Sequence, residues 1–406
     1  MHTYRDLFRT PEFTPLFLTS TLQVAGSTVS TLALGTLVYA STGSPLLSAL
    51  AMFGPSLAQV LGATVLLSAA DRLPPRAALT GLALVFALCT AGQTVPGLPV
   101  WGTFLLLFAL GTVAALGGGV RYGLLHQILA RDGFLIGRSV LNMSVGTMQI
   151  CGFAVGGVLL TALSPRGVLL VAVALYLAAA VVARLGLTHH PARAAGRPSL
   201  TQTWRTNALL WSSRPRRAVY LALWVPNGLI VGCESLFVAY DPERAGVLFL
   251  AGAVGMLAGD TLVGRFVPAR WRQRLSMPLR ALLAVPYLLF ALHPPLPVAV
   301  IAVLVASVGF AASLLLQERL MALTSDETSG HALGLYSAGL LALQGVGAAL
   351  AGAVAEVTSP PTAMTAMALL SLAVTVALTP GLRAQPTPPA AGAAARRPSP
   401  AGSRGD

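Results

Sequence analysis

One carboxylic acid, Glu234, stands inside a long run of uncharged and mostly apolar residues. The run spans positions 218–240 and contains no other charged residue. A charged carboxylate is costly in such surroundings, and burial favours the neutral, protonated form. Glu234 is therefore a candidate for taking up and releasing a proton, the alternative being a carboxyl group that pairs or reaches the surface. A second acid, Asp260, is also a coupling candidate, although an ion pair with Arg265 is the simpler expectation.

Two short basic segments resemble each other, one in each set of six apolar runs. Each follows the second apolar run of a set of six, and each contains an arginine at both ends of a tight loop. In the first segment, Asp71 can accept charge-assisted hydrogen bonds from a neighbouring arginine. The two segments could act as a gate or could simply mark one side of a membrane with charge. Their residues are Asp71, Arg72, Arg76, Gly264, Arg265 and Arg270.

Breaks and amides within the apolar runs mark places where a small molecule could be held. Pro226 stands near the middle of its run, where proline frees a backbone carbonyl and kinks a helix. Amide, hydroxyl and aromatic side chains occur in other runs, and such groups can line a cavity. Each could equally make a polar contact between packed helices. The candidate cavity residues are Gln23, Ser27, Asn142, Gln149, Trp224, Asn227, Tyr336 and Gln344.

The sequence lacks the motifs of common enzyme classes. It contains no HExxH, no GxSxG and no phosphate-binding loop of the Walker type. Its three cysteines stand apart in apolar runs, so they give neither a disulfide framework nor a paired metal site. We therefore expect no enzyme, no cofactor and no metal ion. Any active process would draw on an ion gradient, because the ATP-binding loop is missing.

The composition predicts the elements that position these residues. Hydrophobic residues make up 55% of the 406 residues and charged residues only 10%, too few to cover a large soluble globule. The net charge is +13, and every basic residue apart from histidine is an arginine. A basic balance could indicate nucleic acid binding. The arginines stand in short gaps between apolar runs, however, which is the pattern of a membrane protein.

Twelve apolar runs are long enough to cross a bilayer, whose core of about 30 Å needs about 20 apolar residues per helix. Three long uncharged stretches each hold two spans, and they divide at the turn sequences 41–45, 96–99 and 293–295. The sequence thus predicts an all-α membrane protein with six spans, a polar segment and six more spans.

The chain divides accordingly into four parts. Residues 1–187 form an N-terminal six-helix half, and residues 218–382 form a C-terminal six-helix half. Residues 188–217 form a linker, in which Leu200 and Trp211 share a helical face. That linker is predicted to be a short helix on the membrane surface or a plain solvated segment. Residues 383–406 are rich in proline, alanine and glycine, which is typical of a disordered tail.

The arginines indicate which side of the membrane each loop faces. With the N-terminus taken as inside, only Arg166 and Arg244 of the 26 basic residues fall in outer segments. The positive-inside rule therefore predicts a multi-pass protein of the cell membrane with the linker and both termini in the cytoplasm.

Over residues 1–382 the sequence resembles the major facilitator superfamily. In that family the loop between spans two and three reads Gly-x-x-x-Asp-Arg-x-x-x-Arg, and Leu67 stands here at the leading glycine. The segments 4–8 and 39–44 look like those of bacterial drug and siderophore exporters. A drug-antiporter signature in span five keeps its glycines and lacks its proline, and the arginine of another signature is missing from span four. The matching residues are Asp71, Arg72, Arg76, Gly152, Gly156 and Gly157.

The resemblance implies twelve helices in two pseudo-symmetric six-helix halves that rock about a cavity at mid-membrane. It also implies that Asp71 docks at the start of span eleven, near Thr328, in one conformation only. The function implied is secondary transport, with proton-driven export of a small, partly apolar compound.

Other features of the spans bear on the cargo. Polar residues are few, which suits a lipophilic compound, and no arginine is expected deep in a span, as phosphate import would require. Import of a small solute by the same fold and a membrane receptor without transport are the alternatives. The expected partners are a small-molecule substrate, the proton and the lipid bilayer, without nucleic acid.

Overall fold

The computed structural model describes residues 7–70, 73–129, 131–191, 200–325 and 328–383. Within these residues the chain is helical and contains no strand. It has twelve helical segments that are long and apolar enough to cross a membrane, which confirms the number expected from the sequence. Helices satisfy their own backbone hydrogen bonds, so they can be stable in lipid.

Six long helices form a first group, in which α2 packs against α3, α6 and α7, while α5 packs against α3 and α4. Their apolar side chains meet in a core that contains Leu34, Leu169 and Tyr176. The helices are α2 (Phe13–Thr42), α3 (Pro45–Ala70), α4 (Pro75–Gln93), α5 (Val100–Ile128), α6 (Arg131–Ala162) and α7 (Pro165–Gly186).

The second group contains the remaining spans, three of which are built from more than one segment. Its core gathers Ile230, Phe237, Phe290 and Met364. The segments are α9 (Arg214–Ser235), α10 (Phe237–Tyr240), α11 (Ala245–Phe266), α12 (Ala269–Ala284), η1 (Val285–Leu292), α13 (Leu296–Val308), η2 (Gly309–Ala311), α14 (Ala312–Ala322), α15 (Ser329–Val357) and α16 (Pro360–Arg383).

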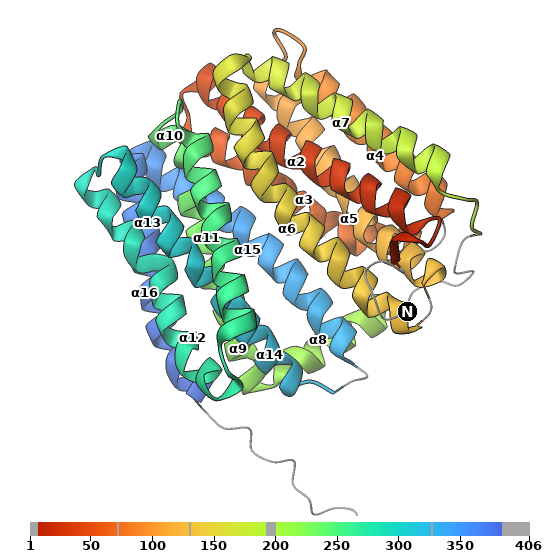
Figure 1. Cartoon of the computed structure of the whole chain (residues 1–406). Helices are drawn as coiled ribbons and strands as arrows, with labels where there is room; N and C mark the ends of the chain where they lie inside the picture. Colours follow the sequence, from red (N-terminus) through yellow and green to blue (C-terminus); the bar gives the residue numbers. More distant parts are fainter. Residues whose placement is uncertain (1–6, 71–72, 130, 192–199, 326–327, 384–406) are drawn as a thin grey trace, which may run out of the picture.

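The start of α2, at the right of Figure 1, and the end of α16, at its bottom, belong to the same side of the protein, because an even number of spans returns the chain to the side where it began. We call this side the terminal end and the opposite side the far end. The expected turns are present at the far end. Gly43 closes α2 with φ +66°, and His293 separates η1 from α13 with φ +50°.

Two helices extend further toward the terminal end than the charge pattern predicts. α5 continues to Ile128, so Arg121 lies within the helix and not at its end. α12 begins at Ala269, so Arg280 also lies inside a helix. The side chain of Arg280 is 2% exposed, and its Nε and Nη2 have no hydrogen-bond partner among the described residues. The expectation that no arginine lies deep in a span is therefore wrong, because a charge does not end a helix whose backbone bonds continue past it.

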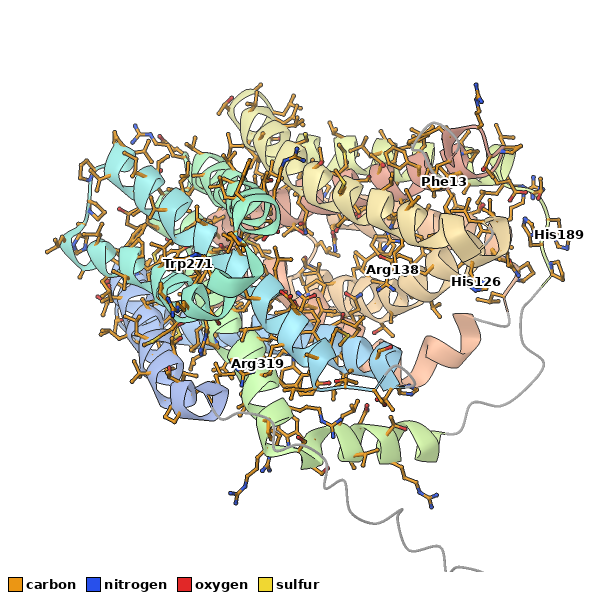
Figure 2. The ribbon with its side chains drawn as sticks, turned by 60° about the horizontal axis from the view of Figure 1, so that its bottom comes forward. Phe13, His126, Arg138, His189, Trp271 and Arg319 are labelled. Carbon is orange, nitrogen blue, oxygen red and sulfur yellow. The ribbon has the colours of Figure 1, made fainter. Side chains whose placement is uncertain are left out.

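The segment between the two groups contains a helix, α8 (Leu200–Ser212). α8 crosses the terminal end rather than running along the spans (Figures 1 and 2). Leu210 is buried, and the Trp211 ring stacks on the ring of Trp224, 5.7 Å away between centroids. The linker thus packs against the first half of α9.

Candidate functional site

A carboxylate joins the two helix groups at the far end. Ser44 Oγ donates a hydrogen bond of 2.9 Å to Glu356 Oε2, and the backbone N–H of Leu46 donates one of 3.3 Å to the same oxygen. Leu46 stands in the first turn of α3, where N–H groups lack helical partners and the helix dipole is positive. Glu356, near the end of α15, therefore binds the start of a helix in the other group.

Two further contacts between the groups lie at the same end. Tyr39 Oη donates a hydrogen bond to the carbonyl of Ala239 at 3.4 Å, and the rings of Phe153 and Phe249 stack 4.8 Å apart. These phenylalanines belong to α6 and α11. The two helices lie together at the far end and diverge toward the terminal end (Figure 1).

A cavity of about 250 Å³ lies within the first helix group. Residues of α2, α3, α4 and α5 surround it, and an apolar part is formed by Leu79, Leu82 and Phe86. Thr19 stands about 9 Å along α2 and Ser27 about 21 Å along it, at 1.5 Å per residue, so the cavity extends toward the middle of the helices. Its polar residues are Thr19, Ser20, Gln23, Ser27, Gln59 and Arg121.

Two of the candidates expected from the sequence, Gln23 and Ser27, line this cavity together. Gln59 and Arg121 also line it, although the sequence analysis did not select them as cavity residues. Gln59 carries a detectable signal, since it is the one amide of α3, a helix without charged residues. Sequence reasoning misses Arg121, because it expects no arginine deep in a span. The four residues come from three helices, so only the packing of those helices could show that they share a cavity.

Arg121 gives the cavity a positive charge. Its Nε is buried and has no hydrogen-bond partner in the described part of the chain, and its guanidinium lies 5.2 Å from the centre of the Tyr122 ring. The described residues that line the cavity include no aspartate or glutamate. A cation that meets no carboxylate among them favours the entry of an anion.

The candidates of the second helix group pair with one another instead of lining this cavity. Trp224 Nε1 donates a hydrogen bond to the carbonyl of Tyr336 at 2.9 Å, and Gln344 Nε2 donates one to Asn227 Oδ1 at 3.3 Å. The Trp224 ring also packs against Gly339. These contacts hold α9 against α15, which is the packing role that the sequence left open for them.

The last two cavity candidates lie on α6. Gln149 is exposed, and it is not among the residues that line the cavity in the first group. Asn142 lies in the same helix, but its side chain is outside the described part of the structure. Gln149 therefore does not join the group formed by Gln23 and Ser27.

Glu234 is half-buried beside other polar groups of the second core. A Cβ placed on Gly252 would lie 3.8 Å from Glu234 Oε1 and 3.5 Å from Ser307 Oγ, so both side chains approach the same point on α11. Glu234 also interacts electrostatically with Tyr287. Ser307 Oγ and Tyr287 Oη are buried and lack hydrogen-bond partners within the described residues. Among the same residues, Glu234 makes no ion pair.

Asp260 is exposed on α11, one turn and a half before the end of the helix. It forms no ion pair with Arg265 in the described structure, and it interacts electrostatically with Tyr336 on α15 instead. The simple inner salt bridge expected for this acid is therefore not formed here.

The gate candidates lie at the terminal end. Arg76, in the first turn of α4, donates hydrogen bonds from Nε, at 2.9 Å, and from Nη2 to the carbonyl of Arg184. A cation is favourable at that place because Arg184 stands in the last turn of α7, where carbonyls are unpaired. Gly264 and Arg265 are exposed near the end of α11. Asp71 and Arg72 lie outside the described residues, as does the side chain of Arg270.

Comparison with known proteins identifies the fold. The sequence matches no protein-family model and no curated protein sequence. A solved POT family transporter in complex with a thioalcohol-conjugated peptide is similar with a TM-score of 0.72 and 11% identity, covering 92% of this chain and 96% of that one. The chain has the major facilitator fold.

Other transporters share this architecture. The nucleoside transporter NupG is similar with a TM-score of 0.70 and 16% identity, covering 92% of this chain and 99% of that one. A bacterial homologue of the human lysosomal transporter Spinster, in an inward-facing and unoccupied conformation, has a TM-score of 0.67 and 14% identity, covering 92% and 95%. At such low sequence identity, the similarity establishes the arrangement of the helices but does not identify the substrate.

Proposed function

We propose that the protein is a secondary transporter that exports a small, partly apolar compound by alternating access, driven by an ion gradient. The observation that carries this proposal is the arrangement of the two helix groups. They are held together at the far end through Glu356 and Tyr39, while α6 and α11 diverge toward the terminal end. Together with the major facilitator fold, this arrangement suits a carrier open on one side of the membrane.

The terminal end is proposed to face the cytoplasm. His126 and Arg138 lie at that end of the first group, and Trp271 and Arg319 lie at that end of the second (Figure 2). Arginine is favoured in cytoplasmic segments, and tryptophan is favoured at the membrane interface. The conformation seen here would then be open toward the cytoplasm, ready to take up a compound for export through the cell membrane.

The proton is the proposed coupling ion, and Glu234 is its proposed carrier. The acid stands near the hydroxyls of Ser307 and Tyr287, which have no hydrogen-bond partner among the described residues. A carboxyl group that loses its proton there would find hydroxyl donors, so both protonation states could be accommodated. Asp260 is the second coupling candidate, nearer the terminal end.

The gate at the cytoplasmic side is proposed to consist of the two repeated segments. Asp71 would dock at the start of α15 in the opposite conformation, where helix N–H groups attract a carboxylate. Membership of the drug and siderophore exporter branch is part of the same proposal, and its support is the pattern of residues 4–8 and 39–44.

Transport is tested with the purified protein in proteoliposomes under an imposed pH gradient. A panel of labelled drugs, siderophores, peptides and nucleosides is added on either side, and accumulation is followed with and without a protonophore. We expect gradient-dependent accumulation of one class in the direction that corresponds to export. Accumulation in the opposite direction would establish import, and saturable binding without any movement would establish the receptor alternative.

A further inference from the structure

Among the described residues that line the cavity of the first helix group, Arg121 is the one charged residue. It contributes a guanidinium, while the other described lining residues are neutral. Arg121 Nε is buried without a hydrogen-bond partner among the described residues. Leaving a charged donor unpaired in a protein interior is costly, so a ligand that supplies acceptors would be favoured there.

A second polar group in the cavity also lacks a partner. Thr19 is 3% exposed, and its Oγ1 is buried without a hydrogen bond within the described structure. Thr19 lies about 9 Å from the start of α2 and Arg121 about 10 Å from the end of α5, so both belong to the part of the cavity nearest the terminal end. One hydroxyl and one guanidinium at similar depth can bind two oxygens of the same anionic group.

The rest of the cavity has a different character. Leu79, Leu82 and Phe86 of α4 supply apolar surface, and Gln23 and Gln59 supply amides that donate or accept. Gly118 of α5 leaves space, since a Cβ at that position would meet no atom within 4 Å. A ligand with an apolar body attached to its charged group would therefore use both parts.

We infer that this cavity is the substrate site for organic monoanions, with a carboxylate or sulfonate bound by Arg121 and Thr19 and an apolar body against α4. The inference rests on the proposed function, because it names the class of substrate for that transport. A single guanidinium balances one negative charge, so a dianion would leave a charge uncompensated. A cationic compound would meet Arg121 and no carboxylate among the described lining residues, so its binding at this site is disfavoured.

The test measures binding separately from transport. Purified protein in lipid nanodiscs is titrated calorimetrically with benzoate, benzenesulfonate, octanoate and 1-naphthoate. The neutral analogues benzamide, benzenesulfonamide, octanamide and 1-naphthamide have nearly the same shape, and benzyltrimethylammonium serves as a cation. We expect at least one anion to bind about tenfold or more tightly than its neutral analogue, as a charge-assisted contact implies. Equal affinity for the pair, or preference for the cation, would overturn the inference.

Variants locate the binding to this cavity. Arg121→Gln should weaken anion binding about tenfold or more, and Arg121→Lys should retain part of it because the positive charge remains. Gly118→Leu should block the cavity while leaving the charge in place. Arg166→Gln removes the same charge from an exposed position at the far end of this group and should leave binding unchanged. Wild-type anion affinity in both Arg121→Gln and Gly118→Leu would contradict the site.

The same material distinguishes the two proposals. Anion binding that depends on Arg121, without movement of the anion across proteoliposomes, would refute transport and leave the site standing. Movement of a neutral or cationic compound that is insensitive to Arg121→Gln would refute the site and leave transport standing. Monodisperse elution and an unchanged melting temperature show that each variant is folded.

Discussion

Glu234 is the residue proposed to carry the coupling proton. Glu234→Gln keeps the size and hydrogen-bonding capacity of the side chain but removes its ability to release a proton. We expect the variant to bind its ligand and to exchange it without a gradient, while uphill accumulation driven by a pH gradient is lost. Proteoliposome uptake with and without the imposed gradient measures both quantities.

The matched control for this experiment is Glu243→Gln. Glu243 carries the same chemical group only nine residues further along the chain, but it is exposed in the connection between α10 and α11. Its substitution should leave gradient-driven accumulation unchanged. If Glu234→Gln accumulates ligand as well as the wild type, the acid has no part in coupling.

Residue types alone predicted part of the candidate site. Gln23 and Ser27 are candidates because polar side chains in an apolar helix need polar surroundings, and both line the cavity of the first group. The same reasoning could not separate them from Trp224 and Asn227, whose hydrogen bonds are made to α15. The role of each residue depends on which helix packs against it, and the sequence of one span does not contain that information.

Among the elements, α11 and α13 show how closely two spans can approach. A Cβ on Gly255 would collide with the carbonyl of Leu304 and come within 2.9 Å of Ser307 Cβ, whereas a Cβ on Gly264 of the same helix would meet nothing within 4 Å. We expect Gly255→Ala to lower the stability of the protein by about 1–3 kcal/mol through overpacking. Gly264→Ala should leave stability unchanged or raise it slightly, since alanine favours a helix.

Thermal unfolding in the same detergent compares these two variants directly. The prediction concerns the order of the melting temperatures, with Gly255→Ala below the wild type and Gly264→Ala at or above it. Equal melting temperatures for the two variants would show that α11 and α13 are further apart than the structure indicates.

The contact between α15 and α3 holds the two helix groups together at the far end. Glu356→Gln keeps an acceptor for Ser44 and Leu46 but removes the negative charge at the start of α3, so the closed far end should be less favoured. Spin labels on cysteines at exposed positions 41 and 358 report the opening as a longer distance between the two groups. We expect the long-distance population to rise several-fold in Glu356→Gln. An unchanged distance distribution would mean that the carboxylate does not bias the equilibrium.

On the scale of the whole molecule, the sequence predicted the number and order of spans because the bilayer imposes a length on every helix. It predicted the breaks at Gly43 and His293, where turn residues interrupt apolar runs. It could not predict where helices end at the terminal side, since α5 and α12 carry Arg121 and Arg280 within them. Nor could it predict the contacts between helix groups, which join residues as far apart in the sequence as Ser44 and Glu356.

Alternating access requires the far end to open in every transport cycle. A reversible cross-link between cysteines at positions 41 and 358, in a background with Cys89, Cys151 and Cys233 replaced by alanine, would hold the two helix groups together there. We expect transport by the cross-linked protein to stop and to recover when the cross-link is reduced. Ligand binding from the terminal side should persist, because the cross-link holds the protein in the conformation described above.

The single-cysteine variants treated with the same reagent should transport normally. Undiminished transport by the cross-linked protein would show that the compound does not pass between the two groups, and the rocking of two halves would then be the wrong mechanism.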